Sequence, residues 1–164
     1  MYNKRLNGYA SIGYKAKGEN VAAESVDIIF DKNSFLPVYI NDIVNASREV
    51  LIVSPFVTKR RVTQMLQYLG AAVGKQVKVI VITRPAEDFE EKDKSALEIT
   101  LDILKNEGIN MLFKSNIHQK FAVIDQSIVW YGSINLLSFG SAEESIMRLE
   151  SPNIANELMK SIDK

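Results

Sequence analysis

The sequence contains no cysteine, and that absence removes several kinds of site from consideration. Without cysteine the chain has no disulfide framework, no thiolate nucleophile and no zinc site with cysteine ligands. The sequence also lacks an apolar run of the roughly 18 residues that a membrane helix needs, and its polar start lacks the apolar centre of a secretory signal. We therefore expect no membrane partner and a cytoplasmic location.

An excess of charge of one sign is absent too, and histidine is nearly absent. The 20 basic and 20 acidic residues cancel, so attraction to a polyanion would have to come from a local patch. With 164 residues, 46% of them apolar, the chain has the length and composition of one compact domain. Its single histidine, His118, is the residue that most needs an explanation.

The pattern of apolar residues predicts an α/β domain over residues 26–164, preceded by a poorly defined arm over residues 1–25. The expected strands cover 26–30, 50–54, 77–82 and 109–113, and the expected helices begin at 34, 58 and 96. This alternation favours a mixed, mostly parallel sheet with helices on its faces. Two further runs, 118–124 and 127–131, predict a hairpin, and a last helix is expected over 152–162.

The most informative segment combines a basic pair with a later polar turn. His118 and Lys120 are two residues apart, so on a strand both side chains would point to one face, with an imidazole beside a fixed cation. After the hairpin, Gly132 permits close approach of the backbone to a ligand, and the Ser133 hydroxyl and Asn135 amide are hydrogen-bond donors. This set of groups is suited to binding and attacking a phosphate.

These residues resemble the signature of the phospholipase D superfamily. That signature reads His-x-Lys, four residues, Asp, six residues, Gly-Ser-x-Asn, and the segment from His118 to Asn135 fits every position. The resemblance implies the α/β sandwich of the family and phosphodiester chemistry. It further implies that His118 attacks phosphorus to form a phosphohistidine, while a second histidine protonates the leaving oxygen and then activates a water molecule.

One histidine cannot perform both of these tasks at once. Many members of the superfamily carry two copies of the motif in one chain, whereas this sequence carries a single copy. We therefore expect a homodimer whose two-fold axis passes through the active site and brings two His118 and two Lys120 side chains to one phosphate. The resemblance implies no metal ion or other cofactor, because the lysines would stabilise the charge.

Two carboxylates belong to the expected site or its support. Family members place a carboxylate after the Gly-Ser element, where it holds the nucleophilic histidine in the required tautomer. Glu144 is the candidate in this sequence, with Glu143 as the alternative. Asp125 lies seven positions after His118 and would face the opposite side of a regular strand, so we assign it a structural role in the hairpin turn.

Basic side chains near the expected carboxyl ends of strands are candidates for binding nucleic acid. In an open α/β sheet these ends border the ligand crevice. The candidates are Lys59, Arg60, Arg61, Arg84 and Lys114. For the first three, a solvated helix face is an equally good explanation.

The motif determines the reaction type but leaves the substrate open. We favour a metal-independent nuclease that acts on DNA, because the chain shows no amphipathic basic helix for docking to a lipid surface. The segment 131–138 resembles the phospholipase D-like modules of helicase and restriction proteins, so a helicase module in the same or another chain is a candidate partner. Two alternatives stay open, namely a module that binds nucleic acid without turnover, and a lipid phosphodiesterase or phosphatidyltransferase.

Overall fold

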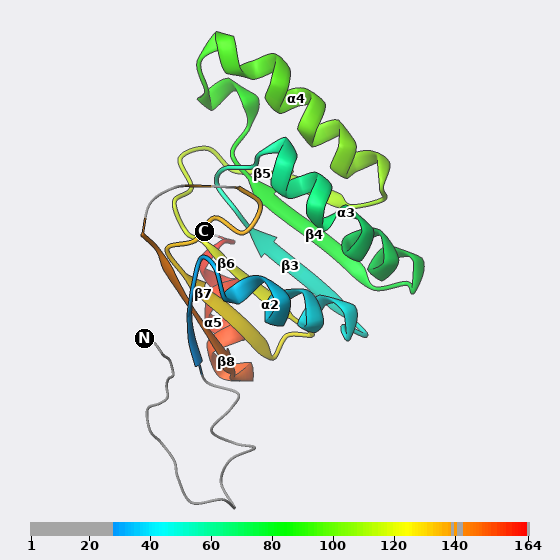
Figure 1. Ribbon diagram of the computed structural model, residues 1–164, viewed down its shortest axis with the longest axis vertical. Coiled ribbons are helices and arrows are strands. Elements are labelled where there is room, and N and C mark those ends of the chain that lie inside the picture. The colour runs from blue at the N-terminus through cyan, green and yellow to red at the C-terminus, as the bar shows by residue number, and fades with distance from the viewer. Residues whose placement is uncertain (1–27, 139, 141–142, 164) are drawn as a thin grey trace, which may run out of the picture.

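A computed structural model describes residues 28–138, 140 and 143–163. The expected arm over residues 1–25 lies outside these residues. Within them, seven strands form one sheet and four α-helices cover its two faces (Figure 1). The prediction of an α/β domain with a mixed sheet flanked by helices is confirmed.

The sheet combines a parallel part with a larger antiparallel part. Its strands are β2 (Ile28–Asp31), β3 (Glu49–Val53), β4 (Lys78–Thr83), β5 (Asn110–Phe113), β6 (Phe121–Ile124), β7 (Ile128–Gly132) and β8 (Ser145–Glu150). They lie in the order β2-β8-β7-β6-β3-β4-β5, in which only β3 with β4 and β4 with β5 pair in parallel among the described strands. The sheet is thus less parallel than expected, because helical crossovers end at β5 and the chain then returns through loops and a hairpin.

The β6–β7 hairpin forms where the sequence predicts it. Its two turn residues, Asp125 and Gln126, have φ of 54° and 57°, which is the backbone of a type I′ turn. The Ser127 amide donates a hydrogen bond to the Ile124 carbonyl oxygen at 3.1 Å and closes the turn. The apolar run 26–30 predicts a buried strand, but β2 is an edge strand whose Ile29 is 72% exposed.

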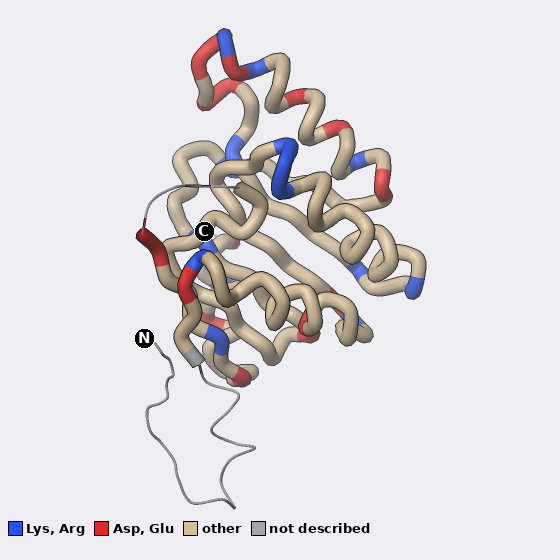
Figure 2. Tube along the Cα trace, in the orientation of Figure 1, with Lys and Arg blue, Asp and Glu red and all other residues tan. Residues whose placement is uncertain are grey.

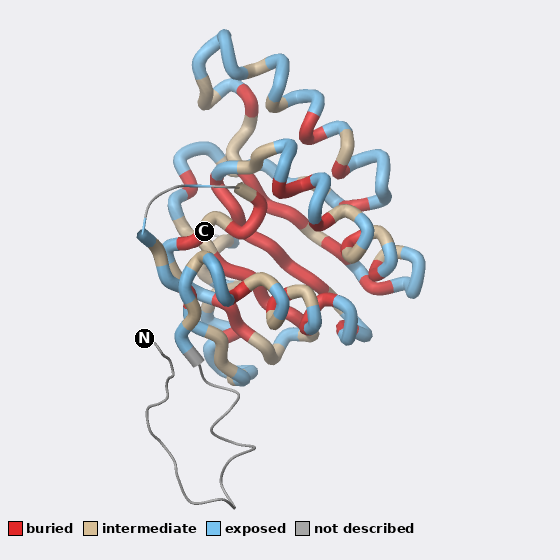
Figure 3. Tube along the Cα trace, viewed as in Figure 1, coloured by how far each residue is buried: buried red, intermediate tan, exposed pale blue. Residues whose placement is uncertain are grey.

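The helices divide between the two faces of the sheet. α2 (Phe35–Val44), α3 (Lys59–Gly74) and α4 (Glu91–Asn106) lie on one face, and α5 (Pro152–Ser161) lies on the other (Figure 1). The central strands β3, β4 and β6 between these layers are mostly buried (Figure 3). Across the described residues, none of the helices combines the length and the apolar character that would let it cross a membrane.

The inner face of α2 differs from the one that apolar periodicity predicts. Periodicity favours a face of Leu36, Ile40, Ile43 and Val44, whereas the buried residues are Phe35, Tyr39, Asp42 and Ile43. Asp42 is tolerated inside because its carboxylate accepts hydrogen bonds from Trp130 Nε1 at 2.8 Å and from Arg148 Nε at 2.7 Å. A polar residue on the buried face therefore joins α2 to β7 and β8.

Candidate active site

The two halves of the signature meet at one end of the sheet. One row of paired residues crosses this end, namely Val53, Phe121, Tyr131 and Met147. It places the loop before β6, which carries the His-x-Lys pair, beside the loop after β7, which carries the Gly-Ser-x-Asn element. The Gly132 amide donates a hydrogen bond to the Lys120 carbonyl oxygen at 3.4 Å and joins the two loops. The carboxyl ends of β3 and β4 border the same edge.

His118 and Lys120 lie just before β6 and not on it. The strand expected over 118–124 begins only at Phe121, because its partner β3 ends at Val53 and offers no further ladder. His118 is exposed, and the Lys120 ammonium donates a hydrogen bond to the His118 carbonyl oxygen at 3.0 Å. A bond from the lysine side chain to the histidine backbone, and not a shared strand face, therefore holds the cation beside the candidate nucleophile.

The C-terminal helix supports the His-x-Lys loop from one side. Ile117 is buried in the core under α5, and the Gln119 side chain donates a hydrogen bond to the Ser161 hydroxyl at 2.9 Å. The Lys114 ammonium donates to the Ile162 carbonyl oxygen at 2.8 Å, where the carboxyl end of a helix attracts a cation. The structure thus places the Lys114 side chain against α5, and its contact with a flanking phosphate stays a prediction.

The side chains of Ser133 and Asn135 are each hydrogen-bonded to a neighbouring segment, Ser133 through two bonds and Asn135 through one. The Ser133 hydroxyl donates to the Ser145 carbonyl oxygen at 3.2 Å and accepts from the Ser145 amide at 3.1 Å. The Asn135 side-chain oxygen accepts from the Phe56 amide at 3.3 Å. Because its oxygen is used in this way, the side-chain NH₂ of Asn135 is the group that can donate to a phosphoryl oxygen.

Gly132 is required by a neighbouring strand, and the predicted approach of a ligand to its backbone stays a prediction. A Cβ atom on Gly132 would lie 2.7 Å from the Cα atom of Ile146 and closer still to the carbonyl oxygen of Ser145. The backbone of β8 therefore occupies the space that a side chain would need. Only glycine lets β7 and β8 pair so closely beside the site.

Asp125 lies at the opposite end of β6 from the His-x-Lys loop. Its carboxylate accepts hydrogen bonds from the backbone amides of Ser47 at 3.0 Å, Arg48 at 2.7 Å and Glu49 at 3.0 Å. The carboxylate thus binds the segment that leads into β3, and not the hairpin turn itself. Partial burial raises the pKa of Asp125, but the hydrogen bonds from these amides lower it by more than burial raises it. The pKa of Asp125 therefore lies below its usual value.

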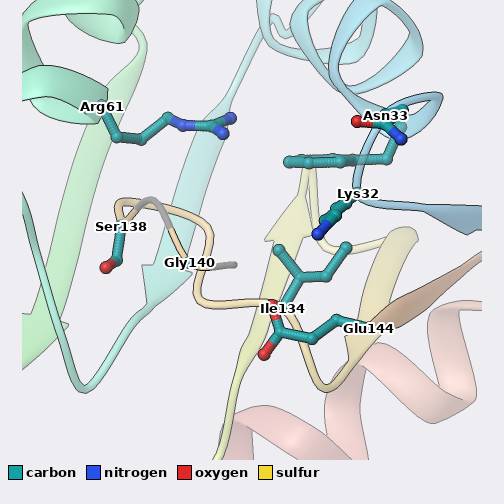
Figure 4. A pocket seen from close by; sticks show the side chains of 8 residues that line it. Lys32, Asn33, Arg61, Ile134, Ser138, Gly140 and Glu144 are labelled. Carbon is teal, nitrogen blue, oxygen red and sulfur yellow. The ribbon is translucent and has the colours of Figure 1, made fainter. Parts of the chain in front are cut away.

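Glu144 lies on a cavity of about 140 Å³ on the face of the sheet that α2 and α3 cover. Figure 4 shows Arg61, Lys32 and Glu144 directed toward this space from three different segments. Among the described residues, the ring of His118 donates no hydrogen bond to Glu144 or Glu143, so the histidine-orienting role stays a prediction. That part of the chain also holds no group of three or more histidine or acidic residues that could bind a metal ion.

The basic residues at the start of α3 do not share one environment. Lys59 and Arg60 are exposed, and Figure 2 shows this basic turn in blue at the start of α3. Arg61 is only 6% exposed, with its guanidinium 5.5 Å from the centre of the Phe35 ring. Burial lowers the pKa of Arg61. Its place in the core argues against the solvated helix face that the sequence allowed for it.

The sequence analysis did not single out Phe56, Asp88 and Phe89, three residues that contact Arg84 beside the site. Arg84 is a predicted binding residue, and its guanidinium lies over the rings of Phe56 and Phe89 and pairs with Asp88 at 3.1 Å. Phe56 comes three residues after Val53, the last residue of the buried strand β3, at the carboxyl end where ligands bind in such sheets. The rule that the carboxyl ends of strands border the ligand crevice pointed to Arg84, and it could have pointed to Phe56 as well.

The comparisons with known proteins agree with this geometry. A family model described as "Cardiolipin synthase, PLD-like domain" matches residues 39–164. Nuc, a phospholipase D family member from Salmonella typhimurium, has a TM-score of 0.66 at 17% identity and covers 82% of this chain and 90% of its own. NucT from Helicobacter pylori has a TM-score of 0.64 at 17% identity, over 82% and 91%. No curated protein matches the sequence.

A phosphatidylserine synthase from Haemophilus influenzae also shares the fold, with a TM-score of 0.69 at 11% identity over 85% of this chain and 36% of its own. At such identities the three structures support the fold and leave the substrate open. The family model, by contrast, is a match of sequence that extends over most of the chain and includes every residue of the signature. The chain therefore belongs to the phospholipase D-like family.

Proposed function

We propose that the protein is a metal-independent phosphodiesterase that cleaves nucleic acid, with DNA as the favoured substrate, through a phosphohistidine on His118. The observation that carries this proposal is the meeting of the exposed His118, the Lys120 ammonium and the Ser133 and Asn135 side chains at one end of the sheet. Membership of the phospholipase D-like family supports phosphodiester chemistry at this site.

In the proposed reaction, an imidazole nitrogen of His118 forms a bond to phosphorus and the bond from phosphorus to the leaving oxygen breaks. The partner's His118 donates a proton to that oxygen. Water then attacks the phosphohistidine, the same imidazole of the partner subunit accepts a proton from the water, and the bond between phosphorus and nitrogen breaks. Lys120 and the amide of Asn135 stabilise the negative charge on the phosphoryl oxygens.

An exposed apolar row next to the site supports the proposed homodimer. Ile29, Met147 and Tyr131 pair in register across β2, β8 and β7, and they are 72%, 41% and 43% exposed. Large apolar side chains grouped on a surface in this way are typical of a protein contact. Because Tyr131 directly precedes Gly132, a second copy on this row would bring its own histidine toward the phosphate.

Nucleic acid is favoured over lipid because of the charge beside the site. Lys59 and Arg60 are exposed in the first turn of α3, and this turn follows β3, whose carboxyl end borders the signature loops. Cations in a row next to the reacting phosphate suit a substrate that carries further phosphates. The association with a helicase module, suggested by the segment 131–138, remains part of this proposal.

The test is hydrolysis of end-labelled DNA in excess EDTA by the wild type and by His118→Ala. We expect the wild type to cleave the DNA and His118→Ala to lose at least about a thousandfold of the cleavage rate. An acid-labile covalent label should form on the wild type alone. Lys92→Ala, an exposed residue of α4, is the control for handling and folding. Cleavage that survives His118→Ala would contradict the proposal.

Two other outcomes would identify the alternatives. Binding to DNA that weakens steeply with salt, with no product and no covalent label, would indicate a binding module without turnover. Release of head groups from phospholipid vesicles, with intact DNA, would indicate a lipid phosphodiesterase or phosphatidyltransferase.

A further inference from the structure

An exposed phenylalanine is fixed to the signature loop. The Phe56 amide donates its hydrogen bond to the Asn135 side chain, and the Ser54 hydroxyl donates to the Phe56 carbonyl oxygen at 2.7 Å. The Leu137 amide in turn donates to the Ser54 hydroxyl at 3.2 Å, and the Thr58 amide donates to the Leu137 carbonyl oxygen at 2.8 Å. The backbone on both sides of Phe56 is therefore held, while Phe56 itself stays 40% exposed.

Phe56 belongs to an aromatic and guanidinium cluster. The rings of Phe56 and Phe89 meet edge to face with their centres 5.7 Å apart. The Arg84 guanidinium lies 5.7 Å from the centre of the Phe56 ring and 5.4 Å from that of Phe89. These contacts hold three flat groups together, and we call Phe56, Phe89 and Arg84 the aromatic platform.

The charge of Arg84 is balanced within the protein. Its Nε atom lies 3.1 Å from a carboxylate oxygen of Asp88, in a pair whose side chains are 15% and 14% exposed. The other oxygen of Asp88 accepts from the Ser115 hydroxyl at 3.1 Å, and the Asn116 amide donates to the carboxylate at 3.0 Å. The same network therefore fixes the platform and the turn that leads into the His-x-Lys loop, two residues before His118.

A guanidinium whose charge is already matched by a carboxylate is better suited to stacking than to holding a phosphate. Lys59 and Arg60 are exposed and follow Phe56 closely in the sequence, so they can contact the phosphates instead. Flat aromatic and guanidinium groups beside a track of cations are the arrangement by which proteins hold single-stranded nucleic acid. Base pairs in a duplex are stacked on each other, so their faces are closed to such a platform.

We propose that the aromatic platform stacks against an unpaired nucleobase next to the reacting phosphate, so that the substrate is single-stranded nucleic acid. This inference rests on the proposed function, because the base is held relative to a phosphodiester at His118. Phe56 supplies the exposed ring, Phe89 and Arg84 fix its orientation, and the bond from Phe56 to Asn135 sets its distance from the phosphate.

The experiment compares two strands of equal length and charge, one with bases and one abasic throughout. We expect Phe56→Ala to lower kcat/KM for the single strand with bases about tenfold more than for the abasic strand, as loss of one stacked base predicts. Phe56→Leu keeps an apolar side chain without a flat ring and should behave like Phe56→Ala, whereas Phe56→Trp should restore the preference. Circular dichroism reports whether each variant is folded.

Phe113→Ala is the matched control. Phe113 is 43% exposed, and the Lys105 ammonium lies 5.6 Å from its ring centre, but it is on β5 and has no bond to the signature loop. We expect the ratio of kcat/KM between the strand with bases and the abasic strand to be the same in Phe113→Ala as in the wild type. The affinity for the same two strands, measured in the His118→Ala background, gives the contribution of the platform to binding without turnover.

The outcomes separate this inference from the proposed function. If the wild type neither cleaves nor binds any strand, the proposed function fails. If the wild type cleaves DNA but Phe56→Ala and Phe56→Leu lower kcat/KM equally for both strands, the proposed nuclease function stands and the inference about the platform is wrong. The platform is also wrong if sedimentation shows that Phe56→Ala separates a dimer into monomers, because the ring would then be a contact between subunits.

Discussion

At the scale of single residues, the two ends of β6 carry different tasks. The His-x-Lys loop before the strand presents reactive groups, whereas Asp125 after it binds three backbone amides of the loop into β3. Both are part of one signature, but only the first belongs to the proposed chemistry. The second keeps β3 and β6 in register, and β3 in turn positions the site.

Asp125→Ala is expected to lower the free energy of unfolding by about 2 kcal/mol, because three amides lose a charged acceptor. Alanine is also disfavoured at the φ of 54° that this residue adopts. Asp125→Asn keeps one acceptor oxygen and tolerates positive φ, so it should cost less. Urea unfolding near neutral pH measures both variants, and equal stability of Asp125→Ala and the wild type would contradict the assigned role.

The contribution of Asp125 should depend on pH in a definite direction. The amides of Glu49, Arg48 and Ser47 outweigh partial burial and hold the folded pKa below the usual value. Such a group stabilises the fold above its unfolded pKa of about 3.9, and that stability is lost as pH falls through the folded pKa. The stability difference between the wild type and Asp125→Asn should therefore shrink below about pH 4. A difference that stays constant down to acid unfolding would argue against this linkage.

Gly132→Ala tests the close pairing of β7 and β8. The new methyl group would overlap the backbone at Ser145 and Ile146, and such overpacking costs about 1–3 kcal/mol. Gly74→Ala is the matched control, because a Cβ atom there meets nothing within 4 Å and alanine favours a helix. Thermal unfolding should give a lower midpoint for Gly132→Ala than for Gly74→Ala. The reverse order would rule out the steric explanation.

At the scale of elements, one buried ion pair joins the two halves of the chain. Asp42 on α2 and Arg148 on β8 form two hydrogen bonds, at 2.7 Å and 2.9 Å, with side chains that are 6% and 11% exposed. The hydrogen bond that Arg148 donates to Asp42 raises the pKa of Arg148. Trp130 on β7 binds the same carboxylate, so the helix is fixed to two strands at one point.

Asp42→Ala is expected to lower the free energy of unfolding by about 3–5 kcal/mol, because it leaves a buried guanidinium without its carboxylate. Glu150→Ala removes a second carboxylate that contacts Arg148, at 3.5 Å and 46% exposed, and should cost at most about 1 kcal/mol. Urea unfolding of both variants gives the comparison. Similar losses in the two variants would mean that burial does not set the strength of this pair.

At the scale of the whole molecule, the proposed site needs two copies of the chain. A two-fold site that uses the imidazole of each subunit loses its acid or its nucleophile when either histidine is removed. If wild type is unfolded and refolded with an equal amount of His118→Ala, random pairing should leave about half of the activity of the wild type alone.

Lys92→Ala in place of His118→Ala controls for the refolding step. With this exposed α4 residue substituted, every pairing retains both histidines, and the activity should not fall. Sites that act independently would give full activity with His118→Ala as well, and that result would contradict the shared site.

The sequence by itself determined the local features, because each depends on residues close together in the chain. Apolar alternation identified the main strands and helices, the Asp125-Gln126 pair identified the hairpin, and the spacing from His118 to Asn135 identified the family. These patterns reflect the periods of strands and helices and the geometry of turns, which act over a few residues.

Only the tertiary structure decided what depends on segments far apart in the chain. The end of β3 leaves His118 outside the ladder, β8 occupies the space beside Gly132, and the Arg61 guanidinium lies over the Phe35 ring. The Asn135 side chain reaches Phe56 across 79 positions of sequence, a separation over which no local pattern acts. Such contacts arise when buried surfaces of distant elements pack together, and strand pairing and core packing, not local periodicity, set their geometry.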